Sequence, residues 1–84
     1  SLYNTLTHME ARLAAGEIDT KKIDREAVEA LSGRGWAVDY LTVRRQSDLL
    51  QPTPEEIANK EPLVVLGAAK LGTTRLIDNL EVTY

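Results

Sequence analysis

The spacing of apolar residues changes at residues 32–35, and this change constrains the fold more than any other feature of the chain. Before it, apolar side chains recur every three or four residues, which places them on one side of a helix. The first set is Leu2, Leu6, Met9 and Leu13, and the second is Ile23, Ala27, Ala30 and Leu31. After it, β-branched and aromatic residues fill the segment 38–43, which is typical of a strand. The spacing therefore predicts two helices followed by a sheet.

Residues that favour helix ends flank both predicted helices. Ser1 and Asp19 can accept hydrogen bonds from the free backbone N–H groups at the start of a helix. Gly16 follows the first apolar set and two glycines follow the second, and glycine often ends a helix because it tolerates a left-handed backbone. The connection between the helices is short, so we expect an antiparallel helical hairpin.

Two further strands are predicted in the second half of the chain. Residues 63–71 and 75–82 flank a turn at 72–74, which indicates a β-hairpin. Residues 46–62 contain all three prolines and predict a loop with one helical turn at 53–58. The expected fold class is α+β. A two-helix hairpin packs on one face of a three-stranded, mainly antiparallel sheet, in the chain order α-α-β-β-β.

The second predicted strand is apolar on both of its faces. Residues 63–69 contain no polar side chain, whereas a strand with one face in water alternates apolar and polar residues. Two helices cover only one face of a sheet, so we expect the other face to need a partner, either a second copy or a domain outside this chain. The alternative is that the second face holds only small residues, such as Gly67 and Ala69, and stays in water.

Length and charge exclude several classes of protein. Eighty-four residues form one small domain, too small for a two-domain cleft that binds a dinucleotide or an acyl adenylate. The absence of cysteine excludes disulfides, thiolate zinc sites and thiol nucleophiles. With 13 acidic and 10 basic side chains the formal charge is −3, and neither half is basic, which argues against a nucleic-acid-binding module.

No apolar run approaches the ~20 residues of a membrane span, and no signal-peptide pattern opens the chain. We therefore expect a soluble, intracellular domain that contacts neither membrane nor nucleic acid. Because Leu2 already belongs to the first helical set, we also expect the chain to be a piece of a longer protein.

Several motif-like features have ordinary structural interpretations. Residues 67–74 resemble a phosphate-binding loop, but Thr73 stands where that loop needs a lysine, and a strand is predicted to follow. His8, the only histidine, has no second ligand nearby, so we expect a solvated side chain rather than a metal or catalytic site. The pair Arg44 and Arg45 could contact a phosphate, but because Asp48 follows closely we expect an ordinary charge cluster at the end of the strand. Trp36 and Tyr40 are expected to anchor the core, with a lid over a ligand as the alternative.

The segment 70–79 holds the best candidates for binding residues. On a regular strand Arg75 and Asn79 share one face and Asp78 lies on the other, so both faces carry a polar residue. Arg75 can pair with Asp39 across the sheet. Asp78 and Asn79 indicate a bulge, a buried hydrogen-bond partner or an interface contact, and hydrogen bonds to loop backbone are the structural alternative.

The C-terminal signature of pantothenate synthetases (pantoate–β-alanine ligases) resembles the string Leu71-Gly72-Thr73-Thr74-Arg75-Leu76-Ile77-Asp78-Asn79-Leu80. The similarity extends to Leu2-Tyr3, to Ala14-Ala15-Gly16-Glu17 and to Val38-Asp39-Tyr40-Leu41. The order helix, helix, strand, variable loop and hairpin agrees as well, so the resemblance covers nearly all of the chain.

The resemblance implies that residues 1–84 are the C-terminal lid domain of a nucleotide-binding ligase whose N-terminal, Rossmann-like catalytic domain lies outside this chain. The full-length enzyme, expected to be a cytoplasmic homodimer, activates pantoate with ATP and magnesium. β-Alanine then displaces AMP from pantoyl adenylate to give pantothenate, on the pathway to coenzyme A. The family's His-rich ATP motif has no counterpart here. We therefore expect the chain alone to bind neither ATP nor magnesium and to be inactive.

By this resemblance, Lys70, Arg75, Asp78 and Asn79 are expected to contact the catalytic domain or the phosphates of the nucleotide. No catalytic residue and no metal ligand is expected among the 84 residues. A lid would protect the hydrolysable acyl adenylate by excluding water. The alternative function is a free-standing α+β interaction module that dimerises through its sheet.

Overall fold

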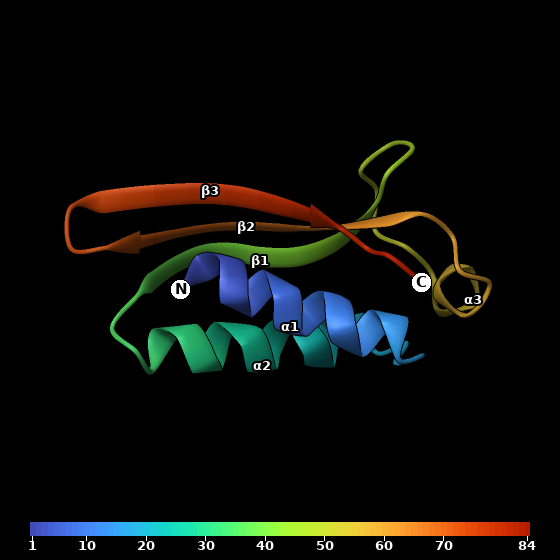
Figure 1. Cartoon of the computed structure of the whole chain (residues 1–84), viewed down its shortest axis with the longest axis horizontal. Helices are drawn as coiled ribbons and strands as arrows, with labels where there is room; N and C mark the ends of the chain where they lie inside the picture. The colour runs from blue at the N-terminus through green and yellow to red at the C-terminus, as the bar shows by residue number, and fades with distance from the viewer.

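A computed structural model describes residues 1–84 and has the predicted order of elements (Figure 1). Helices α1 (Leu2–Ala14) and α2 (Thr20–Ser32) precede strand β1 (Ala37–Arg45). The short helix α3 (Pro54–Ala58) leads to a hairpin of β2 (Leu63–Leu71) and β3 (Thr74–Glu81). The α+β fold class is thereby confirmed.

The sheet has three antiparallel strands in the order β1-β2-β3, so β2 is the central strand. Helices α1 and α2 lie together on one face of the sheet, and no helix covers the other face (Figure 1). The turn between β2 and β3 extends past the ends of both helices (Figure 1). We call the two faces the helix-covered face and the uncovered face.

Side-chain caps fix the start of each helix, as the sequence predicts. Ser1 Oγ accepts a 3.2 Å hydrogen bond from the Asn4 N–H, and Asp19 Oδ1 accepts one of 3.1 Å from the Lys22 N–H. Thr53 forms a reciprocal capping box at the start of α3, which confirms the predicted helical turn. None of the helices is long and apolar enough to cross a membrane.

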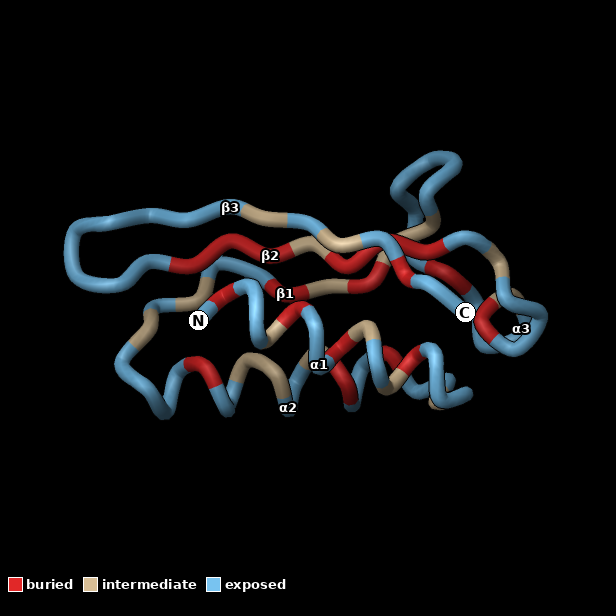
Figure 2. The backbone as a smooth tube through the Cα atoms, viewed as in Figure 1, coloured by how far each residue is buried: buried red, intermediate tan, exposed pale blue.

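The core lies between the helices and the sheet (Figure 2). All four predicted apolar positions of α1 are buried, and so are Ile23 and Leu31 of α2. Ala30 is exposed, contrary to prediction, because it lines an outer groove between the two helices, and Val28 packs against the core instead.

Helix α1 packs directly on the backbone of β2 at Gly67. A Cβ atom at this glycine would lie 2.9 Å from Leu41 Cδ2 and 3.0 Å from Leu6 Cδ2. Gly67 and Ala69 therefore belong to the helix-covered face, which excludes the alternative in which they form a second face of small residues. The second face of β2 holds Val64, Leu66 and Ala68, so this strand is apolar on both faces, as predicted.

Candidate functional site

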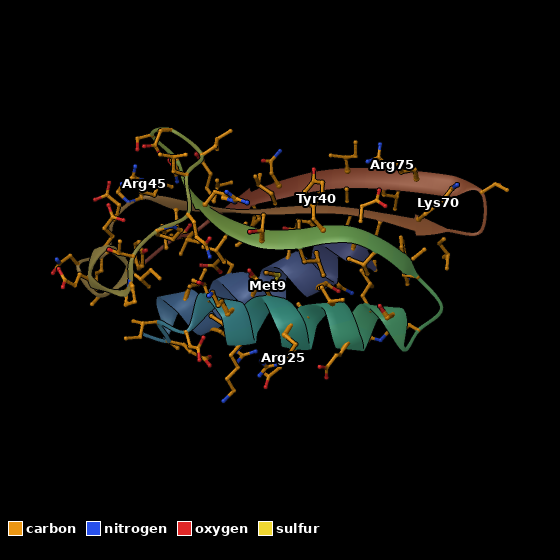
Figure 3. All side chains as sticks on the ribbon, turned by 180° about the vertical axis from the view of Figure 1, so that it is seen from behind. Met9, Arg25, Tyr40, Arg45, Lys70 and Arg75 are labelled. Atoms are coloured by element: carbon orange, nitrogen blue, oxygen red, sulfur yellow. The ribbon has the colours of Figure 1, made fainter.

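The turn of the β2–β3 hairpin places two of the predicted binding residues opposite each other. Gly72 has a φ of 62°, which the first loop residue of a type II′ turn requires, and it reverses the chain between Leu71 and Thr74. In the resulting register Lys70 is the direct partner of Arg75. Partners across strands share a face, so both side chains lie on the uncovered face, near the turn (Figure 3).

A β-bulge in β1 brings a carboxylate to this pair. The register between β1 and β2 shifts between Val38 and Tyr40, which leaves Asp39 without a partner on β2. Asp39 Oδ2 accepts a hydrogen bond of 2.9 Å from Arg75 Nε, across the central strand. The predicted pairing is confirmed, and both side chains are about half exposed, at 49% and 53%.

The other two predicted residues, Asp78 and Asn79, lie on opposite faces of β3, as the alternation along a strand predicts. Asn79 pairs with Leu66 and lies on the uncovered face, whereas Asp78 pairs with Gly67 and lies on the helix-covered face. The pairing of β2 with β3 has no register shift, which excludes the bulge, one of the three interpretations that the sequence left open for Asp78 and Asn79. Asp78 Oδ1 accepts a 2.8 Å hydrogen bond from the backbone N–H of Asn79.

The middle of the uncovered face is apolar. Tyr40, Ala68 and Ile77 form one row across the three strands, and Leu66 lies in the next row. We call these four residues the apolar strip. Tyr40 is 42% exposed and Ile77 65% exposed, whereas Leu66 is half-buried and Ala68 is buried, so solvent reaches the strip at Tyr40 and Ile77. Leu49, from the loop after β1, borders a shallow hollow beside the strip.

The two aromatic residues that the sequence places near β1 have different environments. Trp36 is half-buried and packs against the core, as predicted. Tyr40 does not anchor the core, because the bulge at Asp39 turns its side chain onto the uncovered face. The residues flanking Tyr40 gave no sequence signal for a bulge, so this surface position could not be found from the sequence.

A second feature that the sequence did not indicate is the partly buried Asp24 on α2. Burial raises the pKa of Asp24 to about 6, against the opposing effect of the positive charge of Arg44. Its Oδ1 atom is buried and has no hydrogen-bond partner. Because Asp24 lies on a helix, it is not part of the uncovered face.

The remaining charged clusters connect elements of the fold. Arg45 binds both Asp48 and Glu56, the latter at 2.7 Å, so the predicted strand-end cluster also holds α3. The guanidinium of Arg45, together with the backbone N–H of Leu50, holds the pKa of Asp48 below its usual range. The backbone N–H of Thr53 and then Arg45 do the same for Glu56.

A groove of about 330 Å³ runs between α1 and α2 on the outer side of the helices. His8 lines this groove and is exposed, as predicted. Arg12 binds Glu17 and Glu26, each at 2.6 Å, and so links the C-terminal end of α1 to α2. No group of three or more His, Asp or Glu side chains is placed to hold a metal ion.

A comparison with known protein families adds an independent finding to this geometry. Residues 1–81 match the sequence model of one family, described as Pantoate-beta-alanine ligase. The matched range includes both long helices and all three strands, together with the hairpin that carries Lys70 and Arg75. The resemblance found in the sequence motifs is thereby confirmed over nearly the whole chain.

Proposed function

The chain belongs to the pantoate-beta-alanine ligase family, and from this premise we propose that it is the C-terminal lid domain of a pantothenate synthetase. In this proposal a Rossmann-like catalytic domain precedes it in a full-length enzyme that is cytoplasmic and homodimeric. That domain holds ATP, magnesium, pantoate and β-alanine.

The proposed reaction has two steps. The pantoate carboxylate attacks the α-phosphate of ATP, which forms pantoyl adenylate and releases pyrophosphate. The β-alanine amine then attacks the acyl carbon, the bond to AMP breaks, and pantothenate forms. Water can attack the same acyl carbon, so a cover that excludes water raises the share of adenylate that reaches the amine.

The observation that carries the lid role is the uncovered face. Solvent reaches Tyr40 and Ile77 in the middle of this face, and exposed apolar patches are common where a protein contacts another domain. Lys70, Arg75 and Asn79 lie around the strip on the same face and would contact the catalytic domain or the nucleotide. Asp78, on the helix-covered face, would make such a contact only from the other side of the sheet.

A stoichiometric assay tests the lid role. The full-length enzyme and a variant that lacks this domain are supplied with pantoate, β-alanine and ATP, and AMP and pantothenate are both measured. We expect a one-to-one ratio with the domain and an excess of AMP without it, because unprotected adenylate is hydrolysed. Pantothenate formation by the 84-residue chain alone, or an unchanged ratio without the domain, would refute the proposal.

Point variants locate the contact on the uncovered face. In the full-length enzyme, Ile77→Ser should raise the ratio of AMP to pantothenate, because Ile77 is the most exposed residue of the apolar strip. Leu50→Ser is the control, since Leu50 is 57% exposed but lies in a loop. Arg75→Ala should lower activity while the protein stays folded, and loss of folding alone would assign Arg75 a structural role. If the 84-residue chain instead forms a stable dimer, and Ile77→Ser dissociates that dimer, the result would support the alternative function, an interaction module.

A further inference from the structure

The end of the β2–β3 hairpin carries more positive charge than its neighbours neutralise. Lys70 and Arg75 are direct cross-strand partners, and like charges in that position repel and destabilise a sheet. Asp39 is the only carboxylate paired with either residue, and Lys70 takes part in none of the ion pairs of the structure. One positive charge is therefore left over in a chain whose net charge is −3.

The hydrogen bonding of Arg75 leaves most of its donors free. Only Nε donates to Asp39, at 2.9 Å. A guanidinium has five N–H donors in a planar fork, so the four N–H bonds of Nη1 and Nη2 remain for a ligand. Asp39 thus orients the guanidinium through Nε and leaves the Nη1/Nη2 edge free to bind two anionic oxygens.

The position of the pair leaves room for a ligand. The hairpin end extends past both helices and is exposed from Lys70 to Ile77 (Figure 2). Lys70 and Arg75 lie near the turn in the view from behind, away from the helices (Figure 3). Side chains of direct partners start about 5 Å apart, so the two cations can each bind a different phosphate group of one small anion.

We propose that Lys70 and Arg75 form a binding site for a pyrophosphate group, with Asp39 as the residue that positions Arg75. The site itself is inferred from the geometry. Only the source of the bound anion, which is the triphosphate of ATP or the pyrophosphate released from it, rests on the proposed function. It narrows the contact that the resemblance implies for Lys70 and Arg75, with the catalytic domain or with phosphates, to a pyrophosphate group, and it gives weak anion binding to a chain expected to bind no ATP alone.

Titration of the ¹⁵N-labelled 84-residue chain with sodium pyrophosphate, at constant ionic strength, tests the site by NMR. We expect saturable shifts at Asp39 and residues 70–75, with a millimolar dissociation constant. Lys70→Gln and Arg75→Gln should each weaken binding about three- to tenfold, since each removes a charge-assisted contact at an exposed site. Arg25→Gln makes the same change of charge on α2 and should leave binding unchanged.

Two further arms identify the source of the anion. In the first arm the chain is titrated with ATP. If ATP shifts the NMR signals of the same residues and binds as tightly as pyrophosphate, the site is assigned to the nucleotide. If pyrophosphate binds much more tightly than ATP, the site is assigned to the released product. Adenosine should shift the signals of none of these residues.

The absence of saturable shifts at the hairpin, or equal weakening of binding by Arg25→Gln, overturns the site. Because Lys70 is exposed and takes part in no ion pair, Lys70→Gln should leave the chain folded. This variant therefore still tests the site if Arg75→Gln unfolds the chain. A negative result leaves the lid proposal intact, because the ratio of AMP to pantothenate tests that separately.

Discussion

Replacement of Gly67 by alanine should destabilise the chain, although alanine suits a strand better than glycine does. The added Cβ would lie 2.9 Å from Leu41 Cδ2, 3.0 Å from Leu6 Cδ2 and 3.1 Å from Leu2 Cδ1. All three leucines are at most 4% exposed, so their methyl groups cannot move aside into solvent. The new methyl group must therefore push α1 away from β2 or force leucine side chains out of their preferred rotamers.

The expected loss follows from two opposing effects. An extra methylene in a well-packed core costs about 1–3 kcal/mol. Alanine in place of glycine inside a strand gains about 0.5–1 kcal/mol. Because the close atoms belong to buried leucines that cannot move into solvent, the middle of the packing range, about 2 kcal/mol, applies, and the net loss should be about 1 kcal/mol. For a domain of this size that loss lowers Tm by about 4–8 °C.

Urea unfolding, followed by circular dichroism and Trp36 fluorescence, measures the change. Gly33→Ala is the control, since Gly33 has a φ of −64° and the nearest atom to its added methyl group is a backbone oxygen at 3.3 Å. Its stability should be unchanged or raised by up to about 1 kcal/mol. In a Leu6→Ala background, Gly67→Ala should cost less than in the wild type, because the new methyl group has room. A Gly67→Ala protein as stable as the wild type, or an equal loss in both backgrounds, would refute the packing argument.

Three smaller perturbations test other contacts. Burial raises the pKa of Asp24 to about 6, so this carboxyl should contribute a loss of stability as the pH rises from 4 to 7. Asp24→Asn should remove this loss and raise the free energy of unfolding at pH 7 by about 1 kcal/mol, a value reduced because the side chain is partly exposed. If urea unfolding of the variant and the wild type shows the same dependence on pH, the prediction is contradicted. Arg12→Ala should lower the urea midpoint clearly more than Arg25→Ala does, because the carboxylates of Arg12 lie at 2.6 Å and that of Arg25 at 4.0 Å; equal shifts would show that the shorter pairs add nothing. Thr53→Ala should lower the free energy of unfolding by about 1 kcal/mol, because it removes the side chain that caps α3. An unchanged Tm in thermal unfolding would contradict this prediction.

The order of the helices and strands could be predicted because each depends on signals within a few residues. Ser1 and Asp19 are N-caps in the structure as in the prediction, and the apolar spacing of α1 matches its buried positions. The predicted turn at residues 53–58 forms because Thr53 and Glu56 satisfy each other's backbone N–H groups. Such local features do not depend on how the rest of the chain packs.

The face that each residue of the sheet occupies could be predicted only in part. The β2 segment is apolar at every position from 63 to 69, so no pattern tells its two faces apart. The close approach of α1 decides the matter, and only the face with Gly67 allows it. The bulge at Asp39 had no local signal either, and it reverses the expected environment of Tyr40.

The candidate site was predictable where it depends on the hairpin alone. The two-residue turn fixes the register that places Lys70 opposite Arg75, and charge suggested the pairing of Arg75 with Asp39. The unused donors of Arg75 depend instead on the direction from which the carboxylate approaches, which no sequence pattern records. The burial of Asp24 likewise follows from the way α2 packs against the sheet.

The bulge at Asp39 has a consequence for aggregation. Strands β1 and β3 are the outer strands of the sheet, so each has one row of unpaired backbone N–H and C=O groups that could template further strands. The irregularity at Asp39 interrupts this row on β1, and Arg75, Asp78 and Glu81 place charges along β3. These features disfavour growth of the sheet beyond three strands. Copies of the chain at high concentration should therefore remain separate at their strand edges, and any association should involve the uncovered face.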